Sequence, residues 1–108
     1  MTARTEYEAA YFTMLRAVEE RDGLLRYRDF LHSERERLDA FAEATRGSGE
    51  HVPRRVRRPV EQTDKALLEA VGRRRAVVLD ELGRMEDRIV AAEAFVTECE
   101  VEVAELRR

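Results

Sequence analysis

The chain has 108 residues, a net charge of −3, 44% apolar and 40% charged residues, and only 6% aromatic residues. This balance excludes a disordered chain, and the two prolines with so few aromatic residues argue against a β-sandwich or barrel, so we expect one all-α domain. No apolar run approaches the roughly 18 residues of a membrane span, and the first residues lack the hydrophobic stretch of a signal peptide, which predicts a cytoplasmic protein.

The first predicted element is a long helix over about residues 5–45. Thr5 and Glu8 fit a capping box, in which the threonine hydroxyl and the glutamate each satisfy a free backbone N–H at a helix start. Gly47 lies where a glycine commonly ends a helix. Because Gly23 interrupts the apolar pattern, a kink there, which would give three helices in all, remains an alternative.

The second predicted element is a basic loop over about residues 46–59, followed by a helix over about residues 60–107. Pro59 is suited to the first position of a helix, where no N–H needs a partner. Helices of roughly 60 and 70 Å would need a partner along their length, so the two are expected to fold into an antiparallel coiled-coil hairpin.

The second helix contains the most regular apolar pattern. Its apolar residues recur in alternating steps of three and four, which is typical of a coiled-coil seam. The predicted seam consists of Leu68, Val71, Arg75, Val78, Leu82, Met85, Ile89, Ala92, Val96, Cys99, Val103 and Leu106.

The first helix is less regular, with two stripes that are offset by one residue near Asp22 and Gly23. A helix can absorb such an offset by local unwinding. The first stripe is Tyr7, Tyr11, Met14, Val18 and Leu25, and the second is Leu24, Tyr27, Leu31, Glu34, Leu38 and Phe41.

Folding the helices against each other with a constant index sum of 109 aligns the two predicted seams. This sum places Glu34 opposite Arg75, the polar interruption of each seam, and predicts an ion pair that fixes the register. The apolar pairs are Phe41 with Leu68, Leu38 with Val71, Leu31 with Val78, Tyr27 with Leu82, and Leu24 with Met85.

Many apolar residues remain outside these seams. A lone hairpin would leave them exposed, which favours pairing of two hairpins into a four-helix-bundle homodimer, with a different protein covering this face as the alternative. These residues are Phe12, Leu15, Phe30, Leu67, Val77, Leu79, Val90, Phe95 and Val101.

Charge is segregated along the chain, with a net charge of +5 over residues 46–75 and −5 over residues 76–108. Arginines at a hairpin tip can bind carboxylates or phosphates bidentately. The predicted partner-binding residues are Arg54, Arg55, Arg57, Arg58, Arg73 and Arg74.

These features predict a non-enzymatic adaptor or regulatory protein that binds a macromolecule, with another protein as the first expectation. Nucleic-acid binding without sequence preference by the same arginines is the alternative, although the loop has no aromatic residue for base stacking. A purely structural helical spacer is a third possibility.

The sequence indicates no catalytic residue, no metal site, no cofactor and no small-molecule substrate. His32 and His51 stand apart from any candidate nucleophile, and the single cysteine, Cys99, lies on the predicted seam as a buried thiol. We therefore expect that the protein is not an enzyme.

Overall fold

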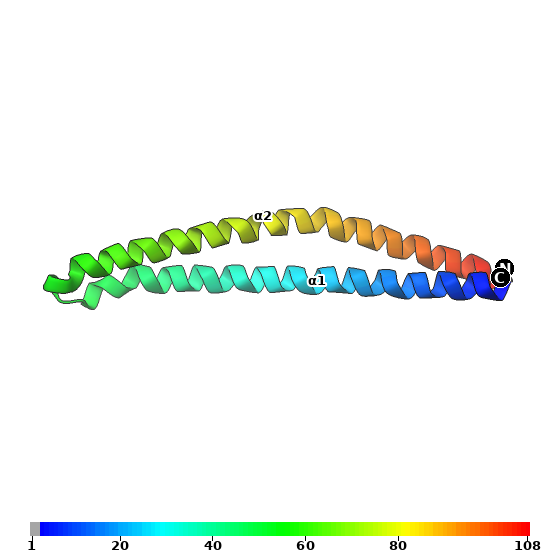
Figure 1. The fold of residues 1–108 in the computed structure, drawn as a ribbon, viewed down its shortest axis with the longest axis horizontal. Coiled ribbons are helices and arrows are strands. Elements are labelled where there is room, and N and C mark those ends of the chain that lie inside the picture. The colour runs from blue at the N-terminus through cyan, green and yellow to red at the C-terminus, as the bar shows by residue number, and fades with distance from the viewer. Residues whose placement is uncertain (1–2) are drawn as a thin grey trace. The chain divides into compact units, whose positions relative to one another are not determined.

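A computed structural model describes residues 3–108, apart from the side chain of Glu50. Helix α1 spans Ala3–Gly47, a short 3-10 helix η1 spans Ser48–His51, and helix α2 spans Arg54–Arg107. The two long helices pack against each other as an antiparallel hairpin (Figure 1), and no strand occurs within residues 3–108. The predicted all-α hairpin is confirmed.

Both helices begin earlier than the sequence pattern indicated. Helix α1 includes Ala3, so Thr5 lies inside the helix and the expected capping box does not mark its start. Helix α2 begins at Arg54, which makes the predicted loop over residues 46–59 much shorter.

Helix α2 can begin before Pro59 because a proline disturbs a helix locally, at its own missing backbone N–H. Pro59 has no N–H to donate to the Arg55 carbonyl, and its ring crowds that carbonyl, but the turn before it is still helical. That turn begins with the Val56 N–H, which donates to the Pro53 carbonyl at 3.1 Å. Pro59 therefore lies inside α2, not at its first position.

The end of α1 also differs from the expected glycine cap. Gly47 has φ −85° and ψ −9°, which is right-handed helical backbone, and the chain then tightens into η1. No residue among those described has a positive φ. The turn between the helices therefore needs no left-handed glycine.

The predicted seam of α2 is confirmed residue by residue. All twelve positions from Leu68 to Leu106 are buried or half-buried, and Val78 and Met85 are fully buried. The alternating steps of three and four therefore identified the face of α2 that packs against α1.

The seam predicted for α1 is wrong in part. Tyr11, Tyr27 and Phe41 are exposed, and the helix continues through Gly23, so the three-helix alternative is also wrong. Buried or half-buried residues instead recur without an offset in steps of three and four. This continuous row consists of Tyr7, Ala10, Met14, Ala17, Arg21, Leu24, Arg28, Leu31, Arg35, Leu38, Ala42 and Thr45, and Val18, Leu25 and Glu34 are half-buried beside it.

Three arginines at seven-residue spacing belong to this observed seam of α1. Arg21 pairs with its neighbour Asp22 at 3.1 Å, and Arg28 lies 3.8 Å from Glu86 of α2. Arg35 forms no ion pair or hydrogen bond with any residue whose side chain is described. Their alkyl chains can pack on apolar neighbours while the charged groups reach the seam edge.

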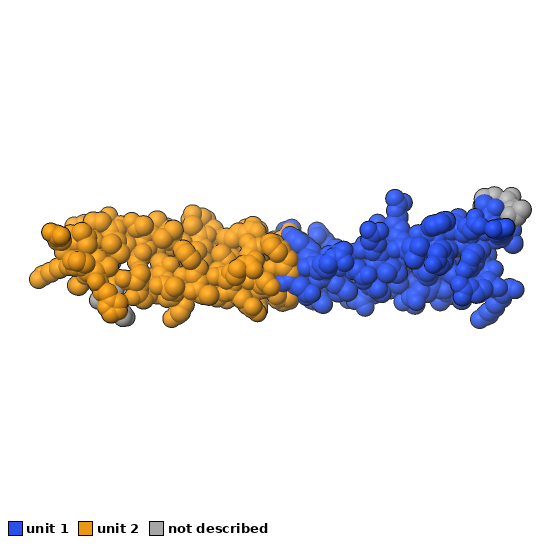
Figure 2. Space-filling view, turned by 90° about the horizontal axis from the view of Figure 1, so that it is seen from below, with its two compact units in different colours: residues 1–29, 83–108 blue, residues 30–82 orange. Residues whose placement is uncertain are grey.

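The hairpin divides into two compact units, which Figure 2 distinguishes by colour. Unit 1 consists of residues 1–29 and 83–108, and unit 2 of residues 30–82. The core of unit 1 includes Ala17, Val96 and Cys99, and burial raises the pKa of the Cys99 thiol, with a smaller contribution from the nearby glutamates. Cys99 is thus a protonated core thiol.

The register of the hairpin differs from the predicted one. Tyr7 meets Arg107, Arg28 meets Glu86, and Asp39 meets Arg75, and each of these pairs has an index sum of 114 where 109 was expected. The small residues Ala42 and Thr45 fill the seam of unit 2 in place of Phe41, which shifts the alignment by about one helical turn.

Candidate protein-binding surface

The predicted Glu34–Arg75 ion pair is not formed. Arg75 Nε donates to Asp39 Oδ1 at 2.7 Å, and Arg74 Nε donates to Glu34 Oε1 at 2.6 Å. The cause is the shifted register, which brings Asp39 to the level of Arg75 and leaves Glu34 at the flank where Arg74 lies. Two ion pairs therefore join the helices of unit 2, one on each side of the seam.

The Glu34–Arg74 pair is the more enclosed of the two. The Glu34 side chain is only 16% exposed, whereas that of Arg74 is 51% exposed. The hydrogen bond from Arg74 is the main cause that lowers the pKa of Glu34, against the opposing effect of partial burial. The second carboxylate oxygen, Oε2, is buried and has no hydrogen-bond partner among the described residues.

Glu34 is expected to make stability depend on pH. Because the folded pKa lies below the usual 4.5, the carboxylate stabilises the fold above that value and this contribution is lost as the pH falls. Urea denaturation from about pH 6 to pH 3 should therefore show a smaller loss of unfolding free energy for Glu34→Gln than for the unsubstituted chain. The matched control, Glu36→Gln at an exposed position, should lose stability as the unsubstituted chain does, and equal slopes for all three proteins would contradict the prediction.

Large apolar side chains lie exposed on both sides of this ion pair. On α1, Phe30 and Phe41 share one helix face with Glu34, and on α2, Leu67 and Val77 share one face with Arg74, as their spacing of three, four or seven residues requires. Because Arg74 bonds to Glu34, the two faces adjoin. We call Phe30, Phe41, Leu67 and Val77 the apolar patch of unit 2; their exposed fractions lie between 41% and 51%.

Sequence reasoning found three members of this patch and misplaced the fourth. Phe30, Leu67 and Val77 were expected outside the seam, whereas Phe41 was expected within it. The alternating steps from Phe30 through Glu34 and Arg37 to Phe41 were the signal that could have found the patch. The Arg37 guanidinium lies over the Phe30 ring, 6.0 Å from its centroid, which adds a cation to the patch.

The predicted tip arginines form the first turns of α2. Arg54, Arg55, Arg57 and Arg58 are all exposed, and no ion pair or hydrogen bond joins them to any residue whose side chain the structure describes. We call these four residues the arginine turn. The first turn of α2 contains no acidic residue, although a helix start favours negative charge. The positive potential of the helix start is therefore reinforced, not neutralised.

Hydrogen bonds of Ser48 connect α1, η1 and α2 at this end of unit 2. The Ser48 hydroxyl lies 2.8 Å from Asp64 Oδ2 of α2 and 2.9 Å from the Thr45 carbonyl of α1. These contacts place η1 directly against α2, so the arginine turn projects from a hydrogen-bonded end of the hairpin.

The remaining predicted partner-binding residues separate into two kinds. Arg73 is exposed and forms no ion pair or hydrogen bond among the described residues, so its guanidinium is available. Arg74 is bound to Glu34, so it lies among the residues of the apolar patch and is not part of a free basic surface.

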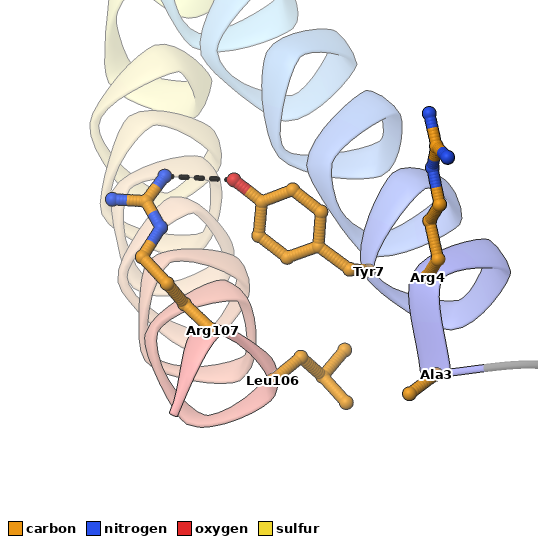
Figure 3. Close-up of a pocket in the computed structure, with 5 residues that line it drawn as sticks. All are labelled: Ala3, Arg4, Tyr7, Leu106 and Arg107. Carbon is orange, nitrogen blue, oxygen red and sulfur yellow. Dashed lines mark hydrogen bonds between the residues drawn. The ribbon is translucent and has the colours of Figure 1, made fainter.

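Unit 1 contains a shallow pocket at the ends of the two long helices (Figure 3). The pocket measures about 360 Å³ and is lined by Ala3, Arg4, Tyr7, Leu106 and Arg107. Arg107 Nη2 donates to the Tyr7 hydroxyl at 2.7 Å, and this hydrogen bond raises the pKa of Arg107. The lining combines apolar side chains with cations and has no nucleophile beside a base, so we assign it no chemistry.

The two histidines that were considered as catalytic residues lie on different elements. His32 and His51 are both exposed, on α1 and η1. Within residues 3–108, no cluster of three or more His, Cys, Asp or Glu side chains is arranged to hold a metal ion. Neither α1 nor α2, as far as the structure describes them, has an apolar stretch that would cross a membrane.

Comparisons with known proteins add no relative. No family model matches the chain, and no curated protein or solved structure is significantly similar to it.

Proposed function

We propose that this chain is a non-enzymatic, cytoplasmic interaction protein of the coiled-coil type that self-associates as a homodimer and binds another protein. The apolar patch of unit 2 and the arginine turn are the surfaces that meet these partners. An apolar centre bordered by arginines is the composition that protein interfaces favour, since arginine and aromatic residues are enriched there.

The observation that supports this proposal is the large exposed surface of the chain. It exposes 8234 Å², whereas a compact protein of 12.6 kDa is expected to expose about 6,200 Å². The excess of roughly 2,000 Å² exceeds the ~800 Å² that one partner contributes to a standard protein interface. Thirteen large apolar residues of the described part of the chain contribute to the exposed surface, so its burial would be favourable.

Light scattering over a range of protein concentrations tests the self-association. The expected result is a mass of about twice 12.6 kDa that falls towards the monomer on dilution. Replacing Phe30 and Phe41 by Ser should shift this equilibrium towards the monomer. The control, Phe12→Ser, removes an even more exposed aromatic side chain outside the patch and should have little effect. A monomer at all concentrations would overturn the self-association.

Non-specific nucleic-acid binding is the second candidate function, favoured by the four exposed guanidinium groups of the arginine turn, which have no partner among the described side chains. Phosphate binding by these groups should weaken steeply with salt, because released counterions drive it. Fluorescence anisotropy with short DNA and RNA at two salt concentrations separates the two functions. Salt-sensitive binding that disappears when the four arginines become Ala would favour the nucleic-acid function over the protein partner.

A further inference from the structure

Two stretches of α2, one at its start and one shortly before its last residues, have opposite charge. The arginine turn lies in a stretch, residues 51–60, that has no acidic residue. Near the other end, residues 89–106 contain five glutamates and no basic residue. We call these five glutamates the acidic segment; they are Glu93, Glu98, Glu100, Glu102 and Glu105.

Neither group of charges has a partner among the described side chains of its own chain. The side chains of the acidic segment are exposed, and none of them forms an ion pair among the described residues. The same holds for the arginine turn. In contrast, Arg74 and Arg75 in the middle of the helix both have carboxylate partners from α1. Other unpaired charges, such as Arg73, lie between them, but among the described residues the arginine turn and the acidic segment are the longest runs of unpaired like charge in α2.

Exposed apolar side chains accompany both charged ends. Val56 lies within the arginine turn, and Phe95 and Val101 lie within the acidic segment. Like-charged side chains around an apolar group tend to keep it apart from a copy of itself, whereas opposite charges bring two such groups together. Contact between an arginine turn and an acidic segment is therefore more favourable than contact between two arginine turns or two acidic segments.

A two-fold axis would satisfy both ends at once. In a symmetric dimer, a contact from the arginine turn of the first chain to the acidic segment of the second is repeated in the opposite sense. Antiparallel α2 helices would form both contacts in one closed particle. Parallel helices would instead place arginine against arginine and glutamate against glutamate, which costs free energy at both ends.

We propose that the arginine turn binds the acidic segment of a second copy of this chain, in a two-fold dimer whose α2 helices run antiparallel. This inference rests on the proposed function, in which the arginine turn meets a protein surface, and it identifies that surface. The excess exposed area derived above is sufficient for such a dimer.

Fluorescence energy transfer between labelled chains tests the orientation. A Cys99→Ala background removes the native thiol, and His51→Cys or Ala104→Cys introduces one exposed labelling site near either end of α2 without altering the charged groups. The expected result is strong transfer from a donor at position 51 to an acceptor at position 104 of the second copy, and weak transfer between two labels at position 51. Strong transfer between the labels at position 51 would show a parallel dimer and overturn the inference, while the proposed function would stand.

Charge reversal tests which groups hold the dimer together. Replacing Arg55, Arg57 and Arg58 by Glu should raise the dimer dissociation constant at least tenfold and remove most of its salt dependence. The matched control reverses Arg16, Arg26 and Arg88, which are also exposed but lie outside the arginine turn, and should raise the constant much less. Mixing the first variant with one in which Glu98, Glu102 and Glu105 become Lys should restore dimers.

The remaining outcomes all contradict the inference in identifiable ways. A chain that is monomeric before any substitution overturns both the self-association and this inference. A mass that grows without limit with concentration indicates end-to-end chains and overturns only the closed dimer. A dimer that is unaffected by the reversal, combined with arginine-dependent binding of RNA or DNA, assigns the arginine turn to nucleic acid.

Discussion

Val78→Asp is expected to abolish the folded hairpin, whereas Val77→Asp is expected to leave it folded. The two residues are neighbours with the same side chain, but Val78 is 0% exposed and Val77 is 51% exposed. A carboxylate at position 78 would lose its hydration without gaining a partner, which costs several kcal/mol, comparable to the whole stability of about 5–15 kcal/mol of a typical domain.

Circular dichroism at 222 nm during thermal and urea unfolding measures this difference. The Val78→Asp protein should be largely unfolded at 25 °C and should show no cooperative transition. The Val77→Asp protein should have an unfolding midpoint close to that of the unsubstituted chain. Since Val77 belongs to the apolar patch of unit 2, its aspartate substitution should also weaken the proposed self-association, measured by light scattering. Cooperative unfolding of the Val78→Asp protein at the unsubstituted midpoint would show that α1 does not cover this position.

The apolar pattern of α2 was sufficient to predict its buried face because large aliphatic residues occupy nearly every seam position. Val78, Met85, Ile89 and Val96 are all nearly or fully buried, and each contributes to an unambiguous spacing. Binary patterning is most informative where the buried residues are the large apolar ones. The single polar member of this seam, Arg75, is half-buried as that pattern required.

The pattern of α1 was misleading because several small residues of this helix are buried, while several large aromatic residues are exposed. Ala10, Ala17 and Ala42 are buried, while Tyr11, Tyr27 and Phe41, which the pattern assigned to the seam, are exposed. Size and hydrophobicity alone assign the aromatic residues to a core. The heptad spacing from Tyr7 to Thr45 was present in the sequence, but arginine at three of its positions concealed it.

The candidate site was predictable only in outline. The basic tip could be recognised from composition, whereas the helical geometry of Arg54 to Arg58 could not, because Pro59 is more common at a helix start than inside one. The ion pairs of Glu34 and Asp39 depend on the register, and a shift of one turn exchanges every cross-helix partner. Such partners follow from the packing of α1, which the sequence pattern did not determine.

The three seam arginines of α1 lead to the second prediction, in which replacing Arg21, Arg28 and Arg35 together by Leu stabilises the hairpin. Seam positions normally hold apolar residues, and the present partners are weak, since Arg28 lies 3.8 Å from Glu86 and Arg35 has no partner among the described side chains. Replacing polar groups at such sites by apolar ones commonly stabilises a protein by about 1–4 kcal/mol. Urea denaturation should therefore show a higher midpoint for the triple variant.

The control for this prediction replaces two exposed arginines of the same helix, Arg16 and Arg26, by Leu, and should leave the midpoint nearly unchanged. The stabilised variant should also lose specificity, because arginines at regular intervals penalise any register or oligomer that buries them more deeply. Light scattering should then detect species other than one discrete oligomer. A triple variant that is less stable than the unsubstituted chain would mean that the arginines make contacts on the seam that leucine cannot replace, and the argument that they serve specificity at the expense of stability would fail.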